Sequence, residues 1–307
     1  MYIYKDKFEA AYWGFIVGDA MGVPYEFLPR NNMDQDPATG MIGYGTHRQP
    51  PGTWSDDTTM MLCVMENLAM NGGTSELSDL FIKWYSEGYH TANGNVFDMG
   101  ITTRTAINKL MRGVLPHRSG SNDEYSKGNG SLMRSLPYAF LADMDESINR
   151  MQAEHAITHQ QLICQHASIF YINLLRGLAE GMSPIDAYSN AGVQIERFLA
   201  ESNDLSNSLN DLKRVLDPDF ANTLTRNIRS SGYVVHTLEA VVWCFLKTGS
   251  FEDAVLKAIN LGEDTDTIAA LTGGLSAVYY GIDSIPSEWH NQIAKKDELE
   301  RQFHLFC

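Results

Sequence analysis

The stretch that most clearly indicates the fold is residues 262–281, which read GEDTDTIAALTGGLSAVYYG. After its acidic start, one face carries four apolar residues at helical spacing: Ile268, Leu271, Leu275 and Val278. Residues three and four positions apart share a face of an α-helix, so this spacing predicts a helix over about 264–281. We expect Gly281 to end the helix, because glycine is the residue best suited to a helix C-terminus.

Similar periodicity runs through most of the chain. It predicts further helices over about 5–20, 57–70, 75–88, 99–112, 130–142, 145–157, 160–180, 183–200, 234–247, 251–261 and 287–304. No stretch alternates between apolar and polar residues convincingly enough to predict a strand. Residues 33–51 and 116–130 are expected to be irregular loops, and a loop as long as the first is often functional. Because no segment resembles an interdomain linker, we expect an all-α chain with one domain over residues 1–307.

Composition and charge exclude some classes of function. The 307 residues carry a formal net charge of −15, which argues against binding to a nucleic-acid backbone but leaves room for a local anion site. No apolar run approaches the roughly 20 residues that span a membrane, and the N-terminus lacks a signal-peptide pattern. The four cysteines form no CxxC pair, so we expect core packing in the reducing cytoplasm, without disulfides or zinc.

Two acidic clusters stand at expected helix starts. They are Trp54-Ser55-Asp56-Asp57-Thr58-Thr59 and Gly262-Glu263-Asp264-Thr265-Asp266-Thr267. Helix capping explains either cluster alone, because Ser and Asp are favoured N-caps and carboxylates in the first turn interact favourably with the helix dipole. Capping is a weaker explanation for two clusters that both carry paired aspartates between hydroxyl groups.

If the two helix starts meet in space, four carboxylates come together: Asp56, Asp57, Asp264 and Asp266. Like charges that close either raise one another's pKa or recruit cations, and two divalent ions would balance the four charges. Oxygen donors without His or Cys suit Mg²⁺ or Mn²⁺. The hydroxyls of Ser55 and Thr267 are available for the remaining positions, and Thr267 shares a helix face with Asp264. The sequence therefore predicts a binuclear metal site.

Four segments, taken together and in this order, resemble the ADP-ribosylglycohydrolase family. They are residues 18–26 (GDAMGVPYE), 54–59 (WSDDTT), 128–134 (GNGSLMR) and 262–274 (GEDTDTIAALTGG). Residues 97–100 and 158–159 look like further family positions. The resemblance spans most of the chain, and it implies a single-domain orthogonal helical bundle with a binuclear Mg²⁺ or Mn²⁺ site in a cleft.

Position by position, the resemblance implies six metal ligands: Ser55, Asp56, Asp57, Asp264, Asp266 and Thr267. Glu26 matches a glutamate on a mobile segment near the metals, and Asp98 matches an acidic residue near the reacting ribose. Hydrolysis of a ribosyl bond needs a water placed and deprotonated at C1″, work that metal ions and a nearby carboxylate can share. We expect catalytic roles for Glu26, Asp56, Asp57 and Asp98; an ordinary solvated glutamate is the alternative for Glu26.

The expected ADP-ribose contacts centre on a glycine-rich turn before an apolar segment: Ser126, Lys127, Gly128, Asn129, Gly130 and Ser131. Glycine lets the backbone approach a ligand, and N–H groups at a helix start favour anions such as a pyrophosphate. Taken alone, this stretch also fits a plain turn. We expect His159 to hydrogen-bond the ligand and Tyr233 to stack on the adenine; a structural histidine and a packing tyrosine are the alternatives.

The sequence therefore predicts a hydrolase that uses two divalent cations to remove ADP-ribose from a protein or a small molecule, with arginine the favoured acceptor. Two alternatives stay open. One is a non-catalytic ADP-ribose-binding or structural protein, against which the complete set of four aspartates argues. The other is an immunity protein that blocks an ADP-ribosylating toxin, for which the loop at 33–51 is the candidate contact.

Overall fold

The regular elements of the computed structural model are helices throughout the residues that it describes, 2–201 and 205–307. The longer helices are α1 (Lys5–Gly22), α3 (Asp56–Ala69), α4 (Thr74–Glu87), α5 (Ile101–Met111), α7 (Met144–His155), α8 (Leu162–Ala179), α9 (Pro184–Glu201), α11 (Val234–Leu246), α13 (Thr265–Tyr280) and α15 (Lys296–Phe306). The shorter ones are α2 (Arg30–Gln35), α6 (Pro116–Ser119), α10 (Leu205–Leu212), α12 (Phe251–Ile259) and α14 (Ser287–His290). Among the described residues, β-type pairing of the backbone is limited to isolated bridges. The predicted all-α class is confirmed.

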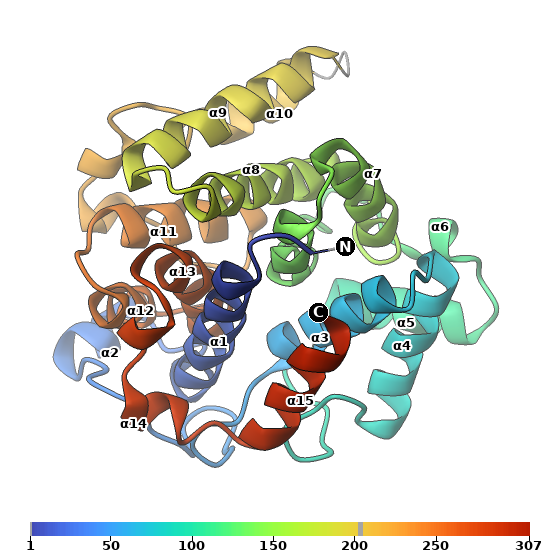
Figure 1. Ribbon diagram of the computed structural model, residues 1–307, viewed down its shortest axis with the longest axis horizontal. Helices are drawn as coiled ribbons and strands as arrows, with labels where there is room; N and C mark the ends of the chain where they lie inside the picture. The colour runs from blue at the N-terminus through green and yellow to red at the C-terminus, as the bar shows by residue number, and fades with distance from the viewer. Residues whose placement is uncertain (1, 202–204) are drawn as a thin grey trace.

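Helices α1 and α13 lie against each other at the centre of the molecule, and α11 and α12 pack on α13 (Figure 1). Glycines in α1 make this close contact possible. A Cβ atom on Gly18 would lie 2.1 Å from the carbonyl oxygen of Ala269, and one on Gly22 would lie 2.3 Å from Cα of Asp266. Since only glycine leaves that space free, the sequence itself brings the C-terminal half of α1 against the start of α13.

The remaining helices surround this central pair. The helix α8 is buried along nearly its whole length and is covered by α9 and α10 on the outside of the molecule, while α15 packs against α3 (Figure 1). One hydrophobic core runs from Tyr2 to Phe306 and includes most of α3, α8, α11 and α13. Within the described residues, none of the helices combines the length and the apolar character that crossing a membrane requires.

The structure corrects two of the predicted helices. Residues 130–142 form two 3₁₀ helices, Leu132–Arg134 and Leu136–Phe140, because Pro137 has no N–H to continue an α-helix. The single helix predicted over 287–304 is divided into α14 and α15. Between them the N–H of Ala294 donates to the carbonyl of Gly52 at 2.9 Å, and Lys295 has a left-handed backbone with φ of 47°. The sequence also gave no sign of α2, α6 and α10.

Candidate metal centre and substrate cavity

The starts of α3 and α13 meet, as the sequence predicted, and α1 adds a carboxylate to them. Ligand oxygens of Asp19, Asp57 and Asp266 all lie within 4.8 Å of one another. Asp19 comes from the last turn of α1, which packs closely against α13 at its glycines. The carboxylate of Asp19 accepts hydrogen bonds from Ser55 N at 3.0 Å and from Thr58 Oγ1 at 2.6 Å. These bonds fix the start of α3 relative to α1.

A second carboxylate group shares Asp266 with the first. Oxygens of Glu26, Asp264 and Asp266 also lie within 4.8 Å of one another. The hydroxyl of Thr267 donates to Asp57 Oδ1 at 3.3 Å, so the two helix starts contact each other directly. Asp266 therefore belongs to both groups of three acidic residues, and this arrangement could hold two ions side by side.

Local helix chemistry accounts for the orientation of these side chains. Ser55 is the N-cap of α3, and its hydroxyl accepts a hydrogen bond from Asp57 N at 3.2 Å. Asp264 is the N-cap of α13, but its side chain makes no capping hydrogen bond. Asp264 Oδ2 instead accepts a hydrogen bond from Asn129 Nδ2 at 2.5 Å, so this carboxylate faces the cavity.

Burial dominates the electrostatics of the cluster. Desolvation raises the pKa of Asp19 and of Asp264 to about 6. Desolvation, followed by the neighbouring carboxylates, raises the pKa of Asp56, Asp57 and Asp266 well above the ordinary range of an aspartate. Because so many carboxylates lie close together out of contact with solvent, either protonation or the binding of cations is favoured here.

Two oxygens of the cluster have no partner in the described part of the chain: Asp57 Oδ2 and Asp266 Oδ2. A buried acceptor without a donor costs free energy, so buried oxygens of this kind are rare unless an ion or a water satisfies them. The donor set consists of carboxylate and hydroxyl oxygens, which hard cations such as Mg²⁺ and Mn²⁺ prefer. The residues present therefore fit divalent cations.

Glu26 has a histidine partner that the sequence interpretation did not identify. The carboxylate of Glu26 is hydrogen-bonded to His47 Nε2, which lies 3.9 Å from Asp98 Oδ1. His47 comes from the predicted loop at 33–51. Desolvation, with the charge of Asp98 next in size, raises the pKa of Glu26 to about 11. His47 thus joins the segment that carries Glu26 to the segment that carries Asp98.

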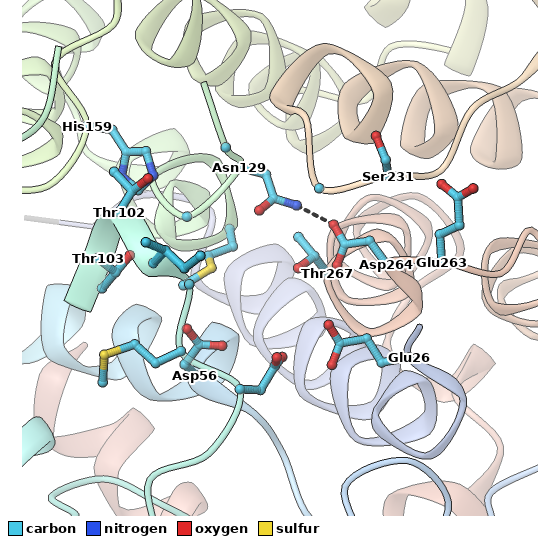
Figure 2. A pocket seen from close by; sticks show the side chains of 18 of the residues that line it. Glu26, Asp56, Thr102, Thr103, Asn129, His159, Ser231, Glu263, Asp264 and Thr267 are labelled. Carbon is cyan, nitrogen blue, oxygen red and sulfur yellow. Dashed lines mark hydrogen bonds between the residues drawn. The ribbon is translucent and has the colours of Figure 1, made fainter. Parts of the chain in front are cut away.

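A cavity of about 490 Å³ opens above this cluster, which is large enough for a nucleotide-sized ligand. Figure 2 shows acidic side chains on its lower and right side and His159, Thr102 and Thr103 on the left. The lining is Glu26, Phe27, Asp56, Asp98, Met99, Gly100, Ile101, Thr102, Thr103, Gly128, Asn129, Gly130, Met133, His159, Ser231, Gly232, Glu263, Asp264 and Thr267.

The glycine-rich turn is held against the start of α11. Asn129 N donates to the carbonyl of Gly232 at 3.1 Å, and Val234 N donates to the carbonyl of Lys127 at 3.0 Å. These two bonds lie on either side of Gly128, which faces Tyr233 in an isolated antiparallel bridge, and the N–H of Gly128 takes part in neither bond. A Cβ atom on Gly130 would lie 2.9 Å from Cε1 of His159, so this position has no space for a side chain.

A buried arginine supports the same wall of the cavity. Arg134 donates to the carbonyl of Gly130 at 2.7 Å and to Thr158 Oγ1 at 2.9 Å. Thr158 Oγ1 lies 2.9 Å from His159 Nδ1, so the guanidinium holds both the turn and the histidine. Desolvation, followed by the charge of Arg134, lowers the pKa of His159 to about 3, and the imidazole is therefore neutral.

The structure places the residues predicted to bind substrate in two groups. Gly128, Asn129, Gly130 and His159 line the cavity, whereas four others are absent from its lining: Ser126, Lys127, Ser131 and Tyr233. Ser126 donates to Asp123 Oδ2 at 2.6 Å, within its own loop. The sequence interpretation missed Asp19, although a charge inside the apolar run at 15–21 was a signal.

Comparisons with known proteins point to one family. The model of the ADP-ribosylglycohydrolase family matches residues 2–306. The chain is 30% identical to the ADP-ribosylarginine hydrolase Tri1 of Serratia proteamaculans, over 96% of this chain and 77% of that protein. It is 29% identical to the ADP-ribosyl-[dinitrogen reductase] glycohydrolase of Rhodospirillum rubrum, over 96% of this chain and 92% of that protein. A solved ADP-ribosylglycohydrolase-related protein complex superposes with a TM-score of 0.80 at 29% identity, over 99% of this chain and 97% of that one.

Proposed function

The chain belongs to the ADP-ribosylglycohydrolase family and is a hydrolase that acts on ADP-ribosyl groups, and we propose that it releases ADP-ribose from modified arginine side chains of a protein. The arginine acceptor is supported by the similarity to two bacterial proteins named as ADP-ribosylarginine hydrolases. We further propose that the reaction uses two divalent cations, Mg²⁺ or Mn²⁺.

One observation carries the metal part of the proposal. Two groups of buried carboxylates share Asp266, and Asp57 Oδ2 and Asp266 Oδ2 lack partners among the described residues. The proposed ligands are Ser55, Asp56, Asp57, Asp264, Asp266 and Thr267, to which the geometry adds Asp19 and Glu26 as neighbours. When bound, the cations would orient the ribose hydroxyls and lower the pKa of a water.

The side chains of the cavity have their own part in the reaction. Hydrolysis breaks the bond between ribose C1″ and a guanidine nitrogen through an oxocarbenium-like transition state; water gives its hydroxyl to C1″ and a proton to the nitrogen. The carboxylates of Asp56 and Asp98 line the cavity, and we propose that they orient the attacking water and accept its proton. Glu26 lines the same cavity next to Asp264 and is held by His47, and we propose a catalytic role for it as well.

The opposite wall suits the rest of the nucleotide. We propose that the pyrophosphate lies along Gly128, Asn129 and Gly130. The N–H of Gly128 takes no part in the two backbone hydrogen bonds that flank it, and a side chain at Gly130 would clash with His159. His159 is neutral and lines the same wall, so it can donate a hydrogen bond without adding charge. Four of the predicted ligand contacts stay predictions, because the residues do not line the cavity: Ser126, Lys127, Ser131 and Tyr233.

We also propose that the partner is an ADP-ribosylated protein and that the location is the cytoplasm. All four cysteines are free: Cys63, Cys164, Cys244 and Cys307. Thiols of this kind suit a reducing compartment.

The proposed function is tested with purified protein and a peptide that carries ADP-ribose on one arginine. We expect release of ADP-ribose with Mg²⁺ or Mn²⁺ and loss of release after chelation. Peptides modified on serine and O-acetyl-ADP-ribose serve as alternative substrates. Release only from serine or acetate would contradict the arginine acceptor, and release from none of the substrates would contradict the enzyme itself.

A further inference from the structure

Phe27 and Glu263 stand side by side at the opening of the cavity. Phe27 N donates to the carbonyl of Glu263 at 2.6 Å, and Glu263 N donates to the carbonyl of Leu28 at 2.7 Å. Both residues line the cavity, and each has a left-handed backbone with φ of 64°. Left-handed backbone is uncommon for residues other than glycine, and here the paired hydrogen bonds hold both residues in it.

Neither side chain is buried in the hydrophobic core. Phe27 is 65% exposed although its ring is large and apolar, and its nearest aromatic neighbour is His47 at 5.8 Å between ring centroids. Glu263 is exposed, and its carboxylate has no hydrogen bond or ion pair with any other described residue. Figure 2 shows Glu263 on the cavity wall beside Ser231, next to Asp264. The exposed ring and the carboxylate belong to residues whose backbones are hydrogen-bonded to each other, and both are available to a ligand in the cavity.

The charge of this wall selects the kind of ligand. Among the described residues that line the cavity, none is Lys or Arg, whereas Glu263 adds a negative charge outside the buried carboxylate groups. A guanidinium matches both side chains, because its plane packs on an aromatic ring and its N–H groups donate to a carboxylate. A serine hydroxyl or an acetate ester offers neither interaction.

The position fits the reaction as well. Glu263 directly precedes Asp264 in the chain, and Asp264 lines the same cavity as Asp56 and Asp98, which are proposed to orient the water that attacks the ribose C1″. The guanidinium of the acceptor is bonded to C1″, so it must lie in the same part of the cavity as that carbon. We infer that Phe27 and Glu263 form the subsite for the guanidinium of the modified arginine. This inference rests on the proposed function and names the residues that determine its acceptor.

The test separates recognition of the guanidinium from recognition of ADP-ribose. KM is measured for a peptide with one ADP-ribosylated arginine, and Ki is measured for ADP-ribose, which lacks only the acceptor. In Glu263→Gln we expect KM to rise about fivefold, as for an exposed charge pair, while kcat and the Ki of ADP-ribose change less than twofold. In Phe27→Leu we expect KM to rise about threefold, the size of an exposed cation–π contact.

Glu288→Gln is the matched control, because Glu288 is an exposed glutamate on α14 and not part of the cavity lining; KM and Ki should stay at their wild-type values. Equal rises of KM and Ki in Glu263→Gln would show that Glu263 acts through the metal centre, and an unchanged KM would show that it contacts no guanidinium. Either result overturns the subsite while leaving the proposed function intact. A wild-type protein that does not cleave the peptide would overturn the proposed function, and the subsite with it.

Discussion

The carboxylate cluster below the cavity and the surroundings of Glu154 both bury carboxylates, but they compensate the charge in opposite ways. Glu154 accepts hydrogen bonds from Arg150 Nε at 2.9 Å, from Asn67 Nδ2 at 3.0 Å and from Tyr138 OH. The carboxylate cluster below the cavity contains Asp57 and Asp266, each with an oxygen that lacks a partner in the described part of the chain. Both carboxylate oxygens of Glu154 thus have partners among the described residues, whereas Asp57 and Asp266 each keep one oxygen without a partner there.

This difference separates structural burial from functional burial. A buried charge is tolerated when it is paired, and its removal then leaves the partner uncompensated. A cluster of like charges without a cationic side chain destabilises the protein unless ions arrive from solution. Matched changes of carboxylate to amide in the two regions should therefore have different consequences.

The largest expected effect is on catalysis. Asp266→Asn keeps the size of the side chain but removes the charge that the two carboxylate groups share. If both cations depend on Asp266, loss of several kcal/mol of transition-state stabilisation should reduce kcat/KM about a thousandfold or more. Steady-state assays with Mg²⁺ and with Mn²⁺ measure this change, and a reduction of less than tenfold with both metals would count against a shared ligand.

The same change at Glu154 should act on stability instead. Glu154→Gln leaves Arg150 without its charged partner, and because Arg150 is partly exposed we expect a loss of about 2–3 kcal/mol in the free energy of unfolding. Asp266→Asn, measured without metal, should lose nothing or become more stable, because it relieves repulsion. Urea unfolding of both variants in chelator gives the comparison. Equal destabilisation would mean that the two regions do not differ as described.

A third way to bury an ionisable group occurs on the cavity wall, where His159 stays neutral. Its pKa is about 3 in the folded protein and 6.5 in the unfolded chain, so the unfolded chain binds more protons between these values. The free energy of unfolding therefore falls as the pH falls below 6.5, by about 2 kcal/mol between pH 7 and pH 5. The pKa shifts of Asp19 and Asp264 act in the opposite direction, so the measured quantity is the difference between wild type and His159→Asn. Parallel pH curves for the two proteins would rule out a buried neutral His159.

The helices and the paired aspartates were accessible from sequence because both are local patterns. Helical periodicity places α3 and α13, and each acidic cluster marks a helix start. Asp19 was missed because its role depends on a long-range contact. It is an interior residue of α1, and only the packing of Gly18 and Gly22 against α13 brings it to the cluster. No local rule identifies an aspartate of this kind, apart from its position inside an apolar run.

Loop residues were harder still to place. His47 and Glu263 lie in irregular segments, and their roles follow from contacts with Glu26 and Phe27 that sequence spacing does not encode. Pro137 shows the reverse case, because a proline signal was present in the sequence and still a helix was predicted across it. The stacking of Tyr233 on the adenine, which was expected from its place at a helix start, stays a prediction, because Tyr233 does not line the cavity.

Binding of Mn²⁺, followed by isothermal titration calorimetry on wild type and Asp266→Ala, is the decisive test of the binuclear site. We predict two ions per wild-type chain and a loss of at least one of them in the variant. Binding that is absent in wild type, or identical in stoichiometry and affinity in the variant, would contradict it.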